Sequence, residues 1–260
     1  MIRRFLTGLV VFCLPFVTMA AEFRVDNNVQ GVKSTVFLLP DRFYSMIGSN
    51  GEIVEFDVEK KMFTLIDPAL RIQTQVNAEE TRQRVEQLRQ QLLSDPNADA
   101  DSFHYFAFQP KFKCEFEPVT GMLALQSHWI DYEIKTIPFM EASADMYYDF
   151  CDWVCYLNFR RNPHSSPMLT RLEVNRFLRQ GRRFAVNVSV SIYVKGKQGF
   201  AKPDQASSSH EIVRRLGEAD HKRIEQAQEF KRTYPLVPFD EYQKRFADKW
   251  VLNEHTSVGR

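Results

Sequence analysis

The 260-residue sequence lacks the features that place a protein in several large functional classes. Its formal net charge is only +1, so no overall electrostatic field attracts nucleic acid or an acidic membrane. It contains no phosphate loop, no dinucleotide-binding fingerprint, no Gly-x-Ser-x-Gly and no His-Glu-x-x-His. Its six histidines are not spaced as metal ligands. We therefore expect no nucleic-acid partner, no metal and no cofactor, and the sequence favours a protein that is not an enzyme.

Tryptophan is scarce, with three residues, whereas phenylalanine is abundant, with 22. Phenylalanine has no polar group to present to water, so such a set is expected in a core or in an apolar binding site. Hydrophobic residues make up 44% of the chain, which is enough for a sizeable core and excludes global disorder.

Long apolar runs are missing except at the N-terminus. There, two arginines precede an uncharged run, Phe5–Met19, and Ala20 and Ala21 supply the small residues of a cleavage site. The run of about 15 residues is shorter than the roughly 20 needed to span a bilayer. The pattern predicts a signal peptide over residues 1–21, cleaved near Ala20 or Ala21. The mature protein is then expected in the periplasm or outside the cell, soluble or peripheral to a membrane.

Strands and helices are predicted from hydrophobic periodicity and from capping residues. Strands are expected at 33–39, 42–47, 52–58, 62–66, 71–76, 103–116, 122–136 and 184–194. Helices are expected after Asn77, at 138–159, from Ser165 or Ser166 to Gly181, and at 220–232. A loop is expected at 201–207, and 210–216 is either a last strand or the start of a helix. The sum is an α+β fold, in which a curved antiparallel sheet of about eight to ten strands packs against several helices. We expect a single domain over 22–260, with a helical C-terminal extension from about residue 218.

The segment 138–159 is the most hydrophobic of the predicted helices. Its apolar stripe is too wide for a surface helix, so it is expected on the concave side of the sheet. Aromatic and aliphatic residues of this helix and of the strands are candidates to line a site for an apolar ligand. These candidates are Phe56, Tyr132, Tyr147, Phe150, Trp153 and Leu157.

Three cysteines, Cys114, Cys151 and Cys155, lie beyond the predicted signal peptide. An exported protein meets an oxidising environment. Cys151 and Cys155 share one helix face and Cys114 lies on the inward face of a predicted strand, so we expect a disulfide from Cys114 to one of the other two. The pattern leaves open which one. The remaining thiol is expected to be buried and inert, and the alternative is a reactive or intermolecular thiol.

Two runs in the first predicted strands carry a family resemblance. Ser34–Phe43 ends in Pro-Asp-Arg-Phe, and Glu52–Leu70 ends in an Asp-Pro-Ala-Leu turn. Both are similar to the opening strands of the periplasmic lipoprotein carriers, the LolA-like proteins, although Ile66 stands where that family usually has an aromatic residue. The resemblance covers about residues 33–76. It implies an exported half-barrel, in which a curved antiparallel sheet wraps over helices and holds acyl chains in an apolar cavity.

The leading hypothesis is therefore an exported, non-enzymatic protein that binds a lipid or a lipid-modified protein between sheet and helices. One alternative is a structural or scaffolding protein of the cell envelope with a filled core. Another is a hydrolase that combines a histidine with Asp145 or Asp149, although these carboxylates are more simply a solvated stripe. The arginines between Arg160 and Arg183 either bind an anionic head group or form a solubilising face.

Overall fold

The computed structural model describes residues 22–48, 51–140, 143–162, 167–193 and 203–247. The predicted signal peptide, with Cys13, lies outside these residues. The strands are β1 (Phe23–Val29), β2 (Val32–Leu38), β3 (Arg42–Ile47), β4 (Ile53–Asp57), β5 (Met62–Asp67), β6 (Ile72–Asn77), β7 (Lys113–Glu117), β8 (Met122–Gln126), β9 (Ile130–Pro138), β10 (Arg183–Ile192) and β11 (Asp204–Val213). The helices are α1 (Ala78–Ser94), α2 (Phe103–Phe108), α3 (Ala144–Arg161), α4 (Pro167–Gln180) and α5 (Glu218–Thr233), and residues 239–247 form one more helical segment.

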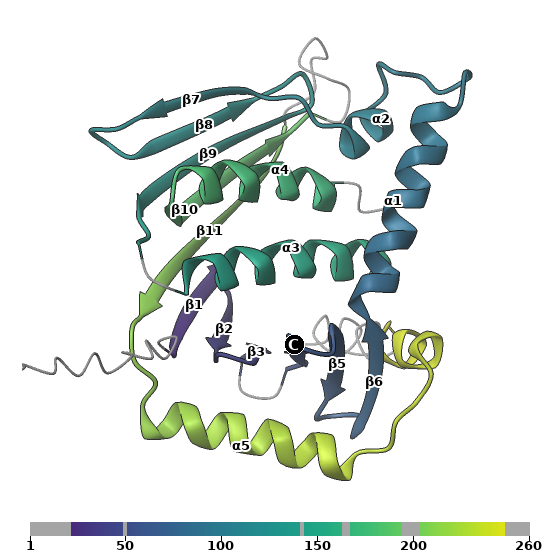
Figure 1. The fold of residues 1–260 in the computed structure, drawn as a ribbon, viewed down its shortest axis with the longest axis vertical. Helices are drawn as coiled ribbons and strands as arrows, with labels where there is room; N and C mark the ends of the chain where they lie inside the picture. The colour runs from purple at the N-terminus through teal and green to yellow at the C-terminus, as the bar shows by residue number, and fades with distance from the viewer. Residues whose placement is uncertain (1–21, 49–50, 141–142, 163–166, 194–202, 248–260) are drawn as a thin grey trace, which may run out of the picture.

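All eleven described strands belong to one open sheet, in the order β6-β5-β4-β3-β2-β1-β11-β10-β9-β8-β7. Every neighbouring pair is antiparallel. The predicted α+β class and the antiparallel sheet are therefore confirmed, with one strand more than the upper end of the expected range. β1 to β6 form one meander, and β7 to β11 form the other half of the sheet. The pairing of β1 with β11 joins these two halves (Figure 1).

Several elements begin where local sequence signals place them. Asn77 caps α1, because its side chain accepts a hydrogen bond from the backbone N–H of Glu80. In β4, Val54 and Phe56 pack into the main core while Ile53 packs on the other face, as the alternation predicts. The meander strands, α1, α4 and β10 all lie close to their predicted positions.

Other segments differ from the expectation. Residues 103–116 are not one strand, because Ser102 caps the short helix α2 before β7 begins. The long strand predicted at 122–136 is two strands, since the Ser127 side chain bonds Ile130 and turns the chain. Residues 201–207 were expected to be a loop, yet from Asp204 onward they belong to β11. β1 was not anticipated at all.

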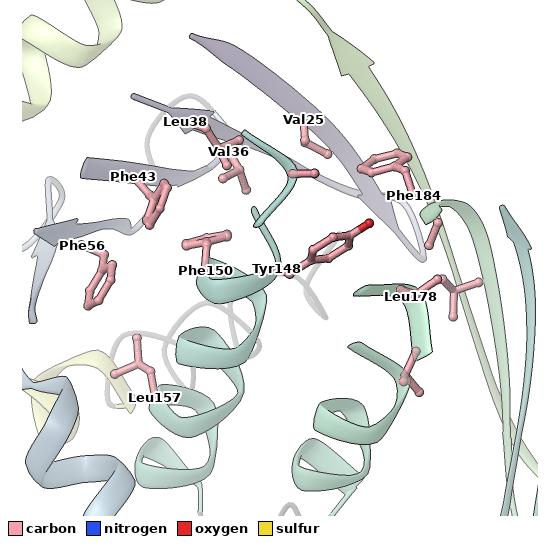
Figure 2. Packing of buried hydrophobic residues seen from close by; sticks show 14 of the residues in the cluster. Val25, Val36, Leu38, Phe43, Phe56, Tyr148, Phe150, Leu157, Leu178 and Phe184 are labelled. Carbon is pink, nitrogen blue, oxygen red and sulfur yellow. The ribbon is translucent and has the colours of Figure 1, made fainter. Parts of the chain in front are cut away.

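The sheet has two differently covered faces. We call the face against α3 and α4 the inner face and the opposite one the outer face. The main core lies on the inner face, where residues of β1 to β6 and β8 to β10 meet α3 and α4 (Figures 1 and 2). A second core lies on the outer face, where Phe37, Tyr44 and Ile66 pack against Ile224 and Ala227 of α5. None of the described helices has the length and apolarity needed to cross a bilayer.

The aromatic face of α3 is enclosed by the sheet, as the sequence predicts. Phe150 points toward the meander strands, with its ring 5.1 Å from that of Phe43 (Figure 2). Tyr148 is 1% exposed and its hydroxyl donates to the Arg183 carbonyl. Because a fully buried large apolar side chain contributes roughly 1.5–3 kcal/mol, this face fixes α3 on the sheet.

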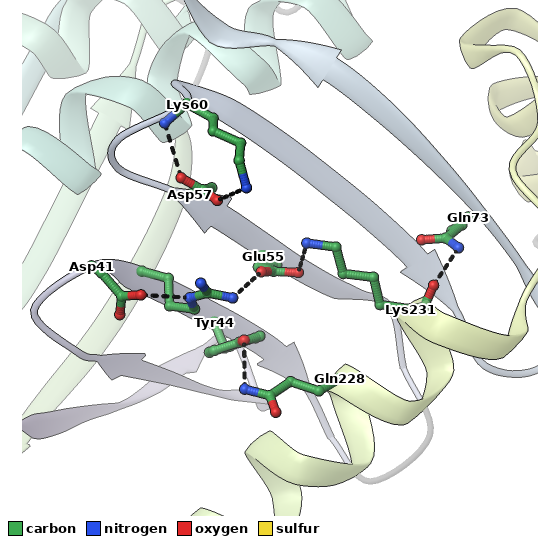
Figure 3. A network of polar contacts seen from close by, with 9 residues as sticks. Asp41, Tyr44, Glu55, Asp57, Lys60, Gln73, Gln228 and Lys231 are labelled. Atoms are coloured by element: carbon green, nitrogen blue, oxygen red, sulfur yellow. Dashed lines mark hydrogen bonds and ion pairs between the residues drawn. The ribbon is translucent and has the colours of Figure 1, made fainter.

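The chain after β11 wraps around the β6 edge of the sheet. On the outer face, the buried carboxylate of Glu55 forms ion pairs with Arg42 at 3.3 Å and with Lys231 of α5 at 2.8 Å (Figure 3). The Gln73 side chain then donates to the backbone carbonyl of Lys231 (Figure 3) and to that of Tyr234, so the chain passes along β6. It reaches the inner core, where Tyr242 is fully buried.

A buried carboxylate fastens this last segment to α3. Arg161 donates to both oxygens of Glu52, at 2.7 and 2.9 Å, and the Tyr242 hydroxyl donates at 2.8 Å. The Glu52 side chain is only 2% exposed. A carboxylate withdrawn from water to this degree needs its partners, because an unpaired buried charge is costly.

We expect Arg161→Met to lower the free energy of unfolding by about 2–4 kcal/mol, because it leaves Glu52 with one hydrogen-bond partner. Urea unfolding at neutral pH measures the loss. Arg245→Met is the matched control, since Arg245 pairs with Glu241 at the surface and should cost less than about 1 kcal/mol. Equal losses in the two variants would contradict the role given to Glu52.

Candidate functional site

The six residues predicted to line an apolar site all belong to or pack against the main core. Phe56, Tyr132, Phe150 and Leu157 are between 1% and 5% exposed, so neighbouring side chains already cover them. Two, Tyr147 and Trp153, are half-buried. The Trp153 ring lies 5.8 Å from that of Phe56, so its cluster fills the meander half of the inner face.

The inner face is less completely covered near β10 and β11. The half-buried apolar side chains there come from α3, β10 and β11: Tyr147, Cys151, Val154, Val190, Ile192 and Ile212. The Tyr147 ring is 5.4 Å from that of Phe184 in β10, which places this side of α3 over the second half of the sheet. Burial raises the pKa of Cys151 to about 11. Cys151 is thus withdrawn from bulk water although its side chain is only half-buried. We infer that it borders interior space that neighbouring side chains do not fill completely.

A chain of hydrogen bonds crosses the β1–β11 seam on this inner face. The ring of His210 bonds the Asn27 Oδ1 through Nδ1 at 2.6 Å and the Ser208 Oγ through Nε2 at 2.9 Å. An amide oxygen only accepts, so Nδ1 carries the proton and the Ser208 hydroxyl donates to Nε2. Asn27 Nδ2 donates onward to Ser34 at 3.4 Å.

His210 is held in its neutral form. Burial lowers its pKa to about 4, and the positive charge of Arg171 on α4 acts in the same direction. At pH 7 the charged imidazolium is then roughly one part in a thousand. Both ring nitrogens are occupied by the neutral hydrogen-bond chain, which fits a neutral ring.

The order Ser208, His210, Asn27 has the layout of nucleophile, base and orienting group. A general base must become an imidazolium during acyl transfer, and an anion normally stabilises it. Here the orienting group is a neutral amide, and the charge that acts on His210 is the positive charge of Arg171. The arrangement is therefore suited to hydrogen bonding and unsuited to activating Ser208.

The carboxylates proposed for a hydrolase have other partners. Asp145 pairs with Arg182 at 2.9 Å and Asp149 with Arg179 at 2.8 Å. Both are exposed. Within the described ranges neither contacts a histidine, so the combination of a histidine with Asp145 or Asp149 is not assembled.

The outer face of β1, β2 and β9 to β11 carries shallow polar depressions. One of them, of about 620 Å³, is lined by charged, amide and hydroxyl side chains such as Asp26, Lys33 and Ser209, and it also reaches Asn27 and His210 of the seam. Two others continue it across β10 and β11. Their lining is half polar or more and they are open to solvent, so this face lacks the enclosed apolar surface of a site for a hydrocarbon chain.

The predicted disulfide is absent, and all three described cysteines are free. Cys114 lies on β7, an edge strand whose residues are all exposed, instead of on an inward strand face. Its charged neighbours are Arg176 and Glu173 of α4. α4 thus stands between this edge of the sheet and α3, which carries Cys151 and Cys155 (Figure 1).

No protein-family model matches this sequence, and no curated protein matches it. Within the described residues, no group of three or more His, Cys, Asp or Glu side chains is placed to hold a metal ion.

We expect Cys114 to react first with a thiol reagent, because it is exposed. Burial raises the pKa of Cys151 to about 11 and that of Cys155 to about 12. Burial raises the pKa of Cys114 as well, but to a smaller extent, so at pH 8 the other two should react more slowly by roughly tenfold or more, since the thiolate is the reactive form. Peptide mapping after timed labelling of the reduced protein measures the three rates. In guanidinium chloride the rates should converge, and a native Cys114 as slow as the other two would contradict its exposed position.

The free energy of unfolding should decrease as the pH is lowered, because the folded protein holds His210 in its neutral form. Its folded pKa of about 4 lies below the unfolded value, so the unfolded chain binds more protons between about pH 6.5 and pH 4. This histidine contributes stability at neutral pH that is lost as the pH falls through that window. Between pH 7 and pH 5 the loss should be at most about 2 kcal/mol.

Urea unfolding of His210→Gln should show a smaller loss over the same pH interval. His221→Gln is the control, because His221 is exposed on α5. A variant lacking His210 that retains the full pH dependence would show that other groups are responsible.

Proposed function

We propose that the protein is an exported, non-enzymatic binder of an apolar chain, supplied by a lipid or a lipid-modified protein. In this proposal the apolar chain of the ligand lies on the inner face, between the helices α3 and α4 and the strands β10 and β11. The observation that carries the proposal is the set of partly accessible apolar side chains in this interior, including Tyr147, Val190 and Ile212. The resemblance of residues 33–76 to LolA-like carriers agrees with it.

The two halves of the inner face have different roles in this proposal. The meander half, around Phe43, Phe56 and Phe150, is filled by its own aromatic rings. The other half carries smaller side chains on its inner face, such as Ala206 and Ser208 of β11. An acyl chain gains about 0.8 kcal/mol for each methylene that it buries, and part of that gain is offset by the entropy lost on association.

A structural protein of the cell envelope is the second candidate. The filled aromatic cluster around Phe150 favours it, because a rigid scaffold needs a packed core and no ligand. In that case the half-buried residues near β10 and β11 would be only loosely packed core, and no hydrophobic probe would bind there.

We expect Val190→Trp to weaken binding of a neutral hydrophobic probe, N-phenyl-1-naphthylamine, by about tenfold or more. Val190 is half-buried on the inner face, so an indole there occupies the volume proposed for the chain. Ser189→Trp is the matched control, because Ser189, the residue before Val190 in β10, is exposed on the outer face. Probe fluorescence measures binding, and circular dichroism shows that each variant is folded.

Native mass spectrometry of the purified protein provides an independent test. The wild-type protein should carry a co-purified lipid that Val190→Trp loses and Ser189→Trp keeps. If neither a lipid nor the probe binds the folded wild-type protein, the proposed function is wrong and the structural role is favoured.

A further inference from the structure

Arg171 differs from the arginines around it. Several arginines near α3 and α4 end in ion pairs: Arg161 with Glu52, Arg176 with Glu173, Arg179 with Asp149 and Asp152, and Arg182 with Asp145. Arg171 is half-buried, and in the described part of the chain its guanidinium has no ion pair and no hydrogen bond. None of its nitrogens is among the fully buried side-chain atoms that lack a partner in the described residues, so the guanidinium is accessible to a ligand.

The charge of Arg171 lies among the groups of the inner face. Burial raises the pKa of the Cys151 and Cys155 thiols, and Arg171 acts against this effect on both. It acts in the same way on the hydroxyl of Tyr132 in β9, and it adds to the lowering at His210 in β11. Arg171 follows Thr170, whose hydroxyl bonds Tyr132 of β9, and it lies one turn before Asn175, which donates to Asp152 of α3. Residues one turn apart share a helix face, so Arg171 is placed between α3 and β9, beside these groups.

The acidic side chain nearest to this space on α3 is already engaged. Asp152 accepts from Asn175 at 2.8 Å and from Arg179 at 2.9 Å. The polar groups of the seam, from Ser208 to Asn27, are neutral and bonded to one another. The positive charge of Arg171 is therefore left without a counter-ion beside an apolar surface.

We propose that Arg171 binds the carboxylate head group of a fatty-acid-like amphiphile whose hydrocarbon chain lies along the half-buried residues of α3, β10 and β11. This inference rests on the proposed function and specifies its ligand class. A planar guanidinium matches a carboxylate with two parallel hydrogen bonds.

The test compares oleate with oleyl alcohol, which has the same chain and no charge. Each displaces N-phenyl-1-naphthylamine from the full-length purified protein at pH 8, where oleate is ionised. We expect the wild type to bind oleate at least tenfold more tightly than the alcohol. Arg171→Met should bind oleate tenfold or more weakly than the wild type and oleyl alcohol equally well, because a hydrogen bond to a charged group is lost.

Arg176→Met is the matched control, since Arg176 lies on the same helix, is exposed and pairs with Glu173. It should retain the preference for oleate. Arg171→Lys keeps the positive charge and should retain part of the preference, so it serves if the methionine variant does not fold. The carbon-13 resonance of carboxyl-labelled oleate should also titrate at lower pH on the wild-type protein than on Arg171→Met.

The outcomes separate the two proposals. Equal affinity of the wild type for oleate and the alcohol, or an unchanged preference in folded Arg171→Met, overturns the head-group assignment and leaves apolar-chain binding intact. Displacement by neither ligand, together with no binding of the probe, overturns the proposed function itself.

Discussion

The pairing of β1 with β11 is the constraint on which the rest of the structure depends. Six residue pairs join the meander to the second half of the sheet. Without them, α3 would face two separate sheets and could not be covered by residues of both. The seam is reinforced from the outer face, because Arg24 of β1 donates to both oxygens of Asp220 in α5. On the inner face the same seam carries Asn27 and His210, so the polar cluster exists only because these strands meet.

The inner face divides because of the residues that the two halves present to the helices. Large rings of the meander, Phe43, Phe56 and Phe63, reach α3 and leave little unoccupied volume. β10 and β11 offer Val190, Ala206 and Ser208 at the corresponding inner positions. Shorter side chains reach less far from the backbone, so these positions lack the rings that fill the meander half. The proposed ligand replaces the rings that the strands lack.

Charge has a structural role at the periphery and a different one inside. Ion pairs fasten α3 through Arg161 and α5 through Lys231 to carboxylates of the meander. Each of these carboxylates is almost completely buried, so the pairs hold the helices in one position. Arg171 follows neither pattern, since its charge faces the interior without a protein anion. A charged side chain with no ion pair among the described residues is a reasonable place to seek a ligand contact.

Short-range signals were sufficient for much of this protein. The meander from β2 to β6, the cap at Asn77 and the alternation of β10 depend on residues close to one another, so the sequence predicts them directly. β1 and the first half of β11 were not found in this way, because residues such as Ser207 to Ser209 are polar and take strand form through pairing, in part with residues about 180 positions away. The surroundings of Cys114 and His210 also depend on distant residues. Cys114 forms no disulfide, and α4 lies between it and the other two cysteines. The ring of His210 is oriented by Asn27, which is far away in the sequence. Periodicity and capping act over a few residues and can be read in order, whereas a binding surface is made by segments that only the folded backbone brings together.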